Sequence, residues 1–274
     1  MGCNHDCSSC ASNCGGEGIQ KLILNDKSSI KRIVGVLSGK GGVGKSMVTS
    51  LLASKMAKMG FKVGVLDADI TGPSMAKSFG IKEKAYQQDG LILPYVTPSG
   101  IKVISTNMLL PNDDDPILWR GSLIVSLVSQ FYKDVNWGEL DVLFIDMPPG
   151  TGDVSLSTFQ QIPVDELIMV TTPQNLVSMI VKKSLNMAHE MDINVLGIVE
   201  NMSYVRCPNC DEHIYIYGHK EKEEIEAEYN EALLARIPFD AEMTKCVDEG
   251  RVEEFDKDYL DYAADCISSL IIGE

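Results

Sequence analysis

Short apolar runs alternate with helix-length segments along most of the chain. The clearest runs are residues 32–37, 62–66, 141–146, 166–172 and 194–201. Between them lie segments with the length and periodicity of helices, and the first of these helical segments ends at Gly60. Because strands that are apolar on both faces must be covered on both faces, the alternation predicts an α/β fold with a mostly parallel sheet flanked by helices.

Three segments depart from this alternation. Residues 90–106 combine strand-forming and turn residues, which predicts a hairpin-like insertion. Residues 255–272 predict a last helix that packs on the domain through one apolar face, made of Leu260, Ala263, Ile267, Leu270 and Ile271. Residues 1–20 hold four cysteines and four glycines and have almost nothing to pack into a core. The chain is therefore predicted to consist of a cysteine-rich tail, 1–20, and one domain, 21–274.

The charge balance narrows the choice of partners. The 274 residues include 24 basic and 39 acidic side chains, a net charge of -15 that repels nucleic acid and anionic membranes. No apolar run approaches the roughly 20 residues of a membrane span, and the first thirty residues do not resemble a signal peptide. We expect a cytoplasmic protein with no nucleic-acid or membrane partner, in which the eight cysteines are metal ligands, packing residues or redox groups rather than disulfides.

The stretch "VLSGKGGVGKSMV" fits two phosphate-binding patterns. Residues 39–44 match GxGxxG, the dinucleotide fingerprint, with Asp67 as a ribose ligand, whereas residues 39–46 match the P-loop GxxxxGK[ST]. Only the P-loop uses Lys45, whose ammonium would reach the β and γ phosphates, and Ser46, whose hydroxyl would bind Mg²⁺. The sequence therefore favours a P-loop.

A P-loop also needs a second carboxylate at the end of another strand, which holds magnesium through water. Asp146 ends the run 141–146 and supplies it. The predicted nucleotide-binding residues of the loop are Gly39, Lys40, Gly41, Gly42, Val43, Gly44, Lys45 and Ser46.

A second lysine, Lys40, directly precedes two glycines in this loop. The sequence here resembles the deviant Walker A P-loop family, which includes nitrogenase iron protein, Min-type and Par-type positioning ATPases, and Mrp/Nbp-type iron-sulfur cluster carriers. Resemblance to the carriers extends over residues 31–240. Its blocks are "SGKGGVGKS", "DADITGPS", "DMPPGTGD", "VTTPQ" and "ENMSYVRCPNC".

This resemblance implies a slow homodimeric ATPase that uses ATP and Mg²⁺. Lys40 would reach across the dimer to the partner's nucleotide, and Asp69 would orient or deprotonate the attacking water, so that the catalytic residues would be Lys40, Lys45 and Asp69. Asp146 would lie near magnesium. The residues that would contact the base are Asn201, Pro238 and Asp240.

The pair Cys207 and Cys210 can place two thiolates on one metal centre, which is half of a four-thiolate set. A two-fold dimer would complete the set. The resemblance implies that the pair is half of a bridging 4Fe-4S site. The alternative is zinc within one chain, bound by both cysteines with His213 and His219.

The tail cysteines are spaced almost like a ferredoxin ligand run and are Cys3, Cys7, Cys10 and Cys14. They are candidates for a second cluster, although carriers with an N-terminal cluster usually have a longer first gap. Zinc or redox-active thiols are the alternatives. Cys246 and Cys266 fall in helical stretches and are predicted to be packing residues.

Together these features predict an ATPase that assembles a 4Fe-4S cluster and passes it to apo iron-sulfur proteins. One alternative is a Min/Par-type positioning ATPase, but that function needs a basic surface or terminal helix and this C-terminus is acidic. The other is an ATP-dependent reductase that resembles nitrogenase iron protein. Reversible electron delivery would distinguish the reductase from a carrier.

Overall fold

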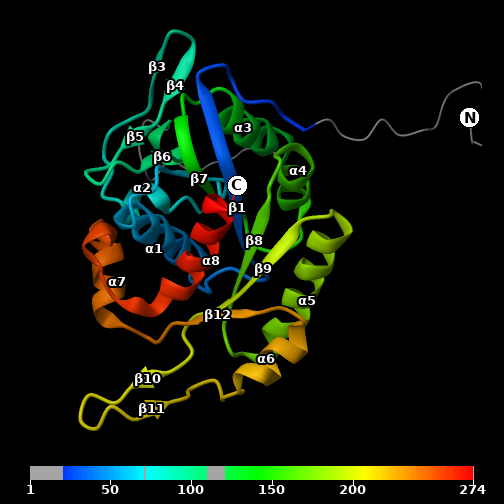
Figure 1. Cartoon of the computed structure of the whole chain (residues 1–274), viewed down its shortest axis with the longest axis vertical. Helices are drawn as coiled ribbons and strands as arrows, with labels where there is room; N and C mark the ends of the chain where they lie inside the picture. The colour runs from blue at the N-terminus through cyan, green and yellow to red at the C-terminus, as the bar shows by residue number, and fades with distance from the viewer. Residues whose placement is uncertain (1–20, 71, 110–120, 274) are drawn as a thin grey trace, which may run out of the picture.

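A central sheet organises the computed structural model, which describes residues 21–70, 72–109 and 121–273 (Figure 1). Within these residues the sheet has eight strands. In spatial order they are β12 (Leu233–Arg236), β9 (Asn194–Glu200), β8 (Glu166–Thr171), β1 (Ser28–Ser38), β7 (Gly138–Asp146), β2 (Val63–Asp67), β6 (Lys102–Ile104) and β5 (Tyr95–Val96). All neighbours pair in parallel except β5 and β6, so the predicted mostly parallel α/β fold is confirmed.

Helices cover both faces of the sheet (Figure 1). One group, in which α1 contacts α8 and α2 contacts α7, comprises α1 (Lys45–Lys58), α2 (Met75–Ser78), α7 (Ala241–Asp248) and α8 (Asp261–Ile272). The other group comprises α3 (Gly121–Lys133), α4 (Asp153–Gln161) and α5 (Asn175–Glu190), and α6 (Lys222–Tyr229) lies beyond β12. Short 3-10 turns, η1 (Thr106–Met108), η2 (Val252–Glu254) and η3 (Asp258–Leu260), join some of these elements.

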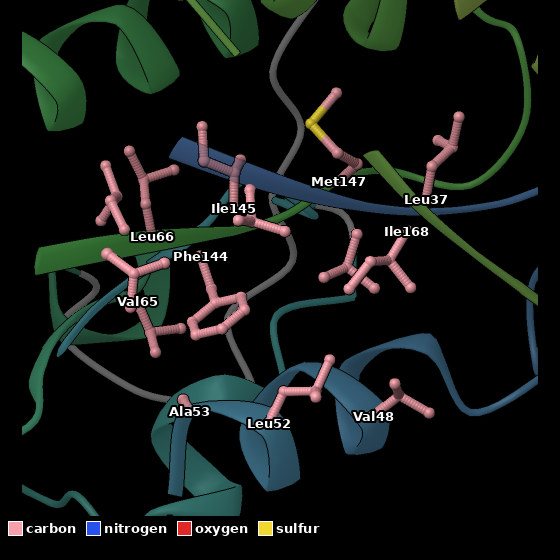
Figure 2. Packing of buried hydrophobic residues seen from close by; sticks show 14 of the residues in the cluster. Leu37, Val48, Leu52, Ala53, Val65, Leu66, Phe144, Ile145, Met147 and Ile168 are labelled. Atoms are coloured by element: carbon pink, nitrogen blue, oxygen red, sulfur yellow. The ribbon is translucent and has the colours of Figure 1, made fainter. Parts of the chain in front are cut away.

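One part of the core lies between α1 and the central strands. Figure 2 shows Leu52 and Ala53 of α1 across from Val65 and Phe144 of the sheet, and all four side chains have no exposed surface. Burying an aliphatic or aromatic side chain of this size stabilises a fold by about 1.5–3 kcal/mol. This packing holds the first turn of α1 firmly at the end of β1.

The segment predicted as an insertion divides into two parts. β3 (Tyr86–Gln88) and β4 (Leu91–Leu93) form an antiparallel hairpin, and its turn uses Asp89 and Gly90 with φ of 53° and 80°. β6 instead pairs in parallel with β2 and extends the main sheet. The prediction of a hairpin is correct, but the second half of the segment belongs to the main sheet.

The last helix starts later than predicted, at Asp261 rather than residue 255. Residues 255–260 cross α1 instead, where Lys58 Nζ donates to the Phe255 carbonyl at 2.7 Å and Lys55 pairs with Asp261 at 2.5 Å. The predicted apolar face is buried at Leu260, Ala263, Ile267 and Ile271. Tertiary contacts with α1 therefore override the local helical periodicity at this end.

The tail 1–20, with its predicted ligand cysteines, lies outside the described residues. In the parts of the chain that are described, no helix is both long and apolar enough to cross a membrane.

Candidate functional site

The glycine loop connects the end of β1 to the start of α1. Gly42 and Gly44 have φ of 82° and 84°, a backbone conformation that favours glycine. A Cβ atom on Gly44 would also lie 2.2 Å from Asn201 Nδ2, so this position has no room for a side chain. No described side chain caps α1, and its first backbone N–H groups are left to bind an anion such as phosphate.

Lys45 is the central cation of this site and is only 5% exposed. Its Nζ lies 2.8 Å from Asp146 Oδ1 and 3.6 Å from Asp69 Oδ2. The structure therefore brings together the loop lysine and the carboxylates that follow β2 and end β7, as the sequence predicted.

Asp146 has no exposed surface, and its carboxylate accepts hydrogen bonds from side chains at the start of α1. Ser46 Oγ donates to Asp146 Oδ2 at 2.5 Å, and Thr49 Oγ1 donates to Oδ1 at 2.9 Å. Sequence analysis did not identify Thr49, although its place one helical turn after Lys45 is a signal that it shares a face with the loop lysine. A hydroxyl and a carboxylate are the oxygen ligands that Mg²⁺ prefers, so Ser46 and Asp146 fit the predicted magnesium site.

A cavity of about 240 Å³ opens above these residues. Its lining is Ser38, Gly41, Gly42, Gly44, Lys45, Ser46, Met47, Asp69, Gly72 and Pro149. A larger cavity of about 400 Å³ lies between α2 and the end of α7. The larger cavity contains none of the glycine loop, so the smaller one is the candidate for nucleotide binding.

Asp67 is fully buried and holds the segment that follows β2. Its Oδ1 accepts from the Asp69 backbone N–H at 3.2 Å, and its Oδ2 accepts from the Ser74 and Met75 backbone N–H groups at 3.1 and 3.2 Å. Ser105 Oγ donates to Oδ2 at 2.9 Å. Burial, together with the nearby Asp146 charge, raises the pKa of Asp67 to about 7. Asp67 therefore fixes the backbone that carries Asp69, a role that the dinucleotide interpretation did not foresee.

Lys40 belongs to the same glycine loop but takes no part in this buried network. Its side chain is exposed, and no acidic group among the described residues lies within ion-pair distance of it. Within one chain, Lys40 is therefore available to contact another molecule.

The residues predicted to contact the base lie at neighbouring strand ends. Asn201 is buried against the glycine loop, where its Nδ2 donates to the Val43 carbonyl at 2.8 Å and its Oδ1 has no hydrogen-bond partner. Pro238 is buried, whereas Asp240 caps α7 by accepting from the Glu242 backbone N–H at 2.9 Å. Lys257 and Tyr259 also donate to the Asp240 carboxylate, at 2.6 and 2.8 Å.

Cys207 and Cys210 lie at the turn of a hairpin that projects from the body of the molecule (Figure 1). Its strands are β10 (Val205–Arg206) and β11 (His213–Ile214). The backbone N–H groups of Asn209 and Cys210 donate to the Cys207 sulfur and lower the pKa of its thiol. Cys207 is partly exposed and Cys210 exposed, so both thiols can reach a ligand outside the chain.

The two histidines of the alternative, zinc within one chain, have other partners in this structure. The His213 ring stacks on Tyr204 with centroids 3.9 Å apart, and His219 Nε2 lies 3.1 Å from Glu221 Oε1. In the described part of the chain, no three His, Cys, Asp or Glu side chains gather closely enough to hold a metal ion. Elsewhere, Cys246 is buried in α7 and Cys266 packs against the core from α8, as predicted.

Comparison with known proteins decides the family. A family model described as ParA, NUBPL iron-transfer P-loop NTPase, matches residues 29–270. The chain belongs to this family.

Relatives in this family carry the name iron-sulfur cluster carrier protein. The protein from Clostridium perfringens is 46% identical over 263 residues, covering 92% of each chain, and the one from Methanococcus maripaludis is 41% identical over 257 residues, covering 90% of this chain and 89% of that protein.

Solved structures show the same fold. A nucleotide-binding protein from Archaeoglobus fulgidus, solved in complex with ADP, aligns with a TM-score of 0.75 and 44% identity over 84% of this chain and 90% of that chain. The cell division ATPase MinD from Pyrococcus furiosus aligns with a TM-score of 0.64 at 22% identity, over 88% of this chain and 99% of that chain, and shows the fold alone.

Proposed function

We propose that this protein is a homodimeric, ATP-hydrolysing carrier that binds a 4Fe-4S cluster through Cys207 and Cys210 and passes it to apo iron-sulfur proteins in the cytoplasm. The observation that carries this proposal is the exposed cysteine pair, which offers two of the four thiolates of a cluster on a projecting hairpin. A second copy related by two-fold symmetry would supply the same two thiolates again. The names of the relatives support the same cargo.

The glycine loop would bind the phosphates of ATP. Backbone N–H groups at the start of α1 and the Lys45 ammonium supply the positive charge, and Lys45 would exchange its present contact with Asp146 for phosphate oxygens. When bound, Mg²⁺ would neutralise phosphate charge, and Ser46 and Asp146 are the residues placed to hold it. Asn201, Pro238 and Asp240 would contact the base.

Hydrolysis requires a group that orients water and a second cation for the transition state. Asp69 would orient or deprotonate the water, because its backbone is held by Asp67 and its carboxylate lies beside Lys45. Lys40 would act on the nucleotide of the partner subunit, which its exposure allows. The tail cysteines Cys3, Cys7, Cys10 and Cys14 remain candidates for a second cluster.

The cargo is tested by loading the protein with iron and sulfide without oxygen. We expect bound iron, labile sulfide and a cluster absorption spectrum in the unmodified protein, and passage of the cluster to an apo-ferredoxin that responds to ATP. Cys207→Ser with Cys210→Ser should abolish the hairpin cluster and its transfer while ATP binding stays near normal. Cys266→Ser, in a cysteine packed against the core, is the matched control.

Full transfer by the Cys207→Ser, Cys210→Ser double variant would show that the hairpin is not the carrier site. If the cluster stays bound and cycles electrons with each ATP hydrolysed, the protein is a reductase instead. Tail cysteine variants should affect transfer less than the hairpin variants.

A further inference from the structure

The hairpin with the cysteines is attached to the body of the molecule at both of its ends. At its outgoing end, the Ser203 backbone N–H donates to the Ile237 carbonyl at 2.9 Å and the Phe239 backbone N–H donates to the Tyr204 carbonyl at 2.8 Å. These bonds continue the pairing of β9 with β12 beyond the sheet. The position of the outgoing strand is therefore tied to the end of β12.

At its returning end, the segment is held by an arginine of the sheet. Arg236 Nη2 donates to the carbonyl oxygen of Lys220, which lies two positions before the first residue of α6. Lys220 Nζ also pairs with Glu228 of α6 at 2.6 Å. Figure 1 shows the returning chain passing from β11 to α6 below β12.

The same arginine contacts the strand that leads to the nucleotide pocket. Arg236 is the register partner of Glu200 in the pairing of β12 with β9, and its Nε lies 3.3 Å from Glu200 Oε2, an ion-pair distance without hydrogen-bond alignment. Ser203 Oγ donates to the same carboxylate oxygen at 2.8 Å. The Glu200 side chain is 9% exposed and the Arg236 side chain 23%, so water screens the pair weakly.

Glu200 is followed directly by Asn201, which donates to the Val43 carbonyl of the glycine loop. A continuous set of contacts therefore runs from the glycine loop through Asn201 and Glu200 to Arg236, and from Arg236 to the returning end of the hairpin. The Arg236 guanidinium can serve both partners because its donors lie in a rigid planar fork.

We propose that Arg236 is a positioning residue that transmits the state of the nucleotide site to Cys207 and Cys210. A change at the glycine loop that shifts the end of β9 moves Glu200, and Arg236 carries this shift to the Lys220 carbonyl. The consequence for cluster release rests on the proposed function. The mechanical link itself can be measured in protein that holds no cluster.

The experiment follows hydrogen exchange of the hairpin amides, residues 205–218, in cluster-free protein with and without Mg²⁺ and a non-hydrolysable ATP analogue. In the unmodified protein we expect the analogue to change hairpin exchange about fivefold or more, the lower end of usual coupling between sites. In Arg236→Gln the ratio of hairpin exchange rates with and without the analogue should fall to about one. The affinity of this variant for the analogue should stay within about twofold of that of the unmodified protein.

Three further variants make the result specific. Arg251→Gln is the matched control, because Arg251 also pairs with two carboxylates, Glu249 and Glu254, but on the surface away from this pathway. It should behave like the unmodified protein. Arg236→Lys keeps the positive charge but loses the planar set of guanidinium donors, so it should reduce the coupling while preserving the fold. Glu200→Gln should also reduce the coupling.

The proposal would be overturned if the hairpin does not respond to the analogue in the unmodified protein, or if it responds in Arg236→Gln and Arg236→Lys as strongly as in the unmodified protein. If Arg236→Gln fails to fold, Arg236→Lys decides alone. Failure of the proposed function looks different: the protein would then bind no cluster, while the exchange pattern would still depend on Arg236. With a bound cluster, the ratio of release rates with and without ATP should approach one in Arg236→Gln.

Discussion

The nucleotide pocket and the cysteine hairpin are built in opposite ways. In the pocket, Lys45 is 5% exposed and Asp146 is fully buried, and the two form an ion pair that Ser46 joins by a hydrogen bond to Asp146. On the hairpin, Cys210 is exposed, and Ile214 and Ile216 remain 50% and 58% exposed. One region pairs its buried charges within a single chain, and the other presents sulfur and apolar groups outward.

This difference explains how the two proposed activities can be separated. Buried ionised groups are costly unless paired, so the pocket must hold its charges in place before a nucleotide arrives. Thiols at a surface do not have this cost of burial. Two thiolates supply only half of the ligands of a four-thiolate cluster. We therefore expect variants of the buried pocket residues to act within each subunit and hairpin variants to act on what two subunits share.

The largest expected effect is that of Lys45→Ala. Loss of an ammonium that contacts two phosphates should weaken Mg-ATP binding about 1,000-fold. Lys40→Ala should leave binding almost unchanged and slow hydrolysis, because this exposed side chain is proposed to act across the dimer. Calorimetric titration with Mg-ATP distinguishes the two variants, and equal losses of affinity would refute the different roles assigned to them.

The trans role of Lys40 can be tested separately in mixed dimers. An unmodified subunit is paired with a hydrolysis-dead subunit that either keeps Lys40 or carries Lys40→Ala, so that only the unmodified subunit's site can turn over and that site either has or lacks its trans lysine. Normal turnover by the site without the trans lysine would show that Lys40 does not act on the partner's nucleotide.

Asp69→Asn should have the next largest effect, slowing the chemical step about 100-fold while ATP still binds. Asp67→Asn should slow it less, because Asp67 acts on the backbone of Asp69 rather than on water. Single-turnover hydrolysis at saturating ATP measures both. If Asp67→Asn stops the reaction and Asp69→Asn does not, the two aspartates have the reverse roles.

A smaller effect should appear in the pH dependence of stability. The folded-state pKa of Asp67 is about 7, above its ordinary value of 3.8, so its contribution to stability is full below the ordinary value and declines as pH rises through 7. Between about pH 5.5 and 8.5 the loss should be about 2 kcal/mol in nucleotide-free protein. Asp67→Asn should remove this slope, measured by urea unfolding at each pH; an unchanged slope would assign the decline to another group.

Cys246→Ala should have the smallest effect of these variants and tests the difference between a buried packing cysteine and the cysteines of the hairpin. This buried residue of α7 loses only packing, so the free energy of unfolding should fall by about 1 kcal/mol and the iron content should not change. Loss of iron from this variant would mean that helix packing, and not only the hairpin, determines cluster binding.

Much of the fold and of the pocket follows from local sequence patterns. The period of apolar residues decides strand or helix within each segment, and Gly42, Gly44 and Lys45 carry a backbone conformation and a charge that identify a phosphate loop. Asp146 was predictable because a residue that ends a parallel strand must lie at the same edge of the sheet as the loop.

Other features depend on contacts between distant segments, and only the tertiary structure decided them. The pairing of β6 with β2, and the contacts of α1 that delay the start of α8, involve residues that no local period connects. The same holds for the four donors around Asp67 and for Arg236 between Glu200 and Lys220. The sequence alone determined which groups the chain carries and the strand or helix character of most segments. Packing decided which of those groups meet, because hydrogen bonds and ion pairs between distant segments form only once the sheet has brought those segments together.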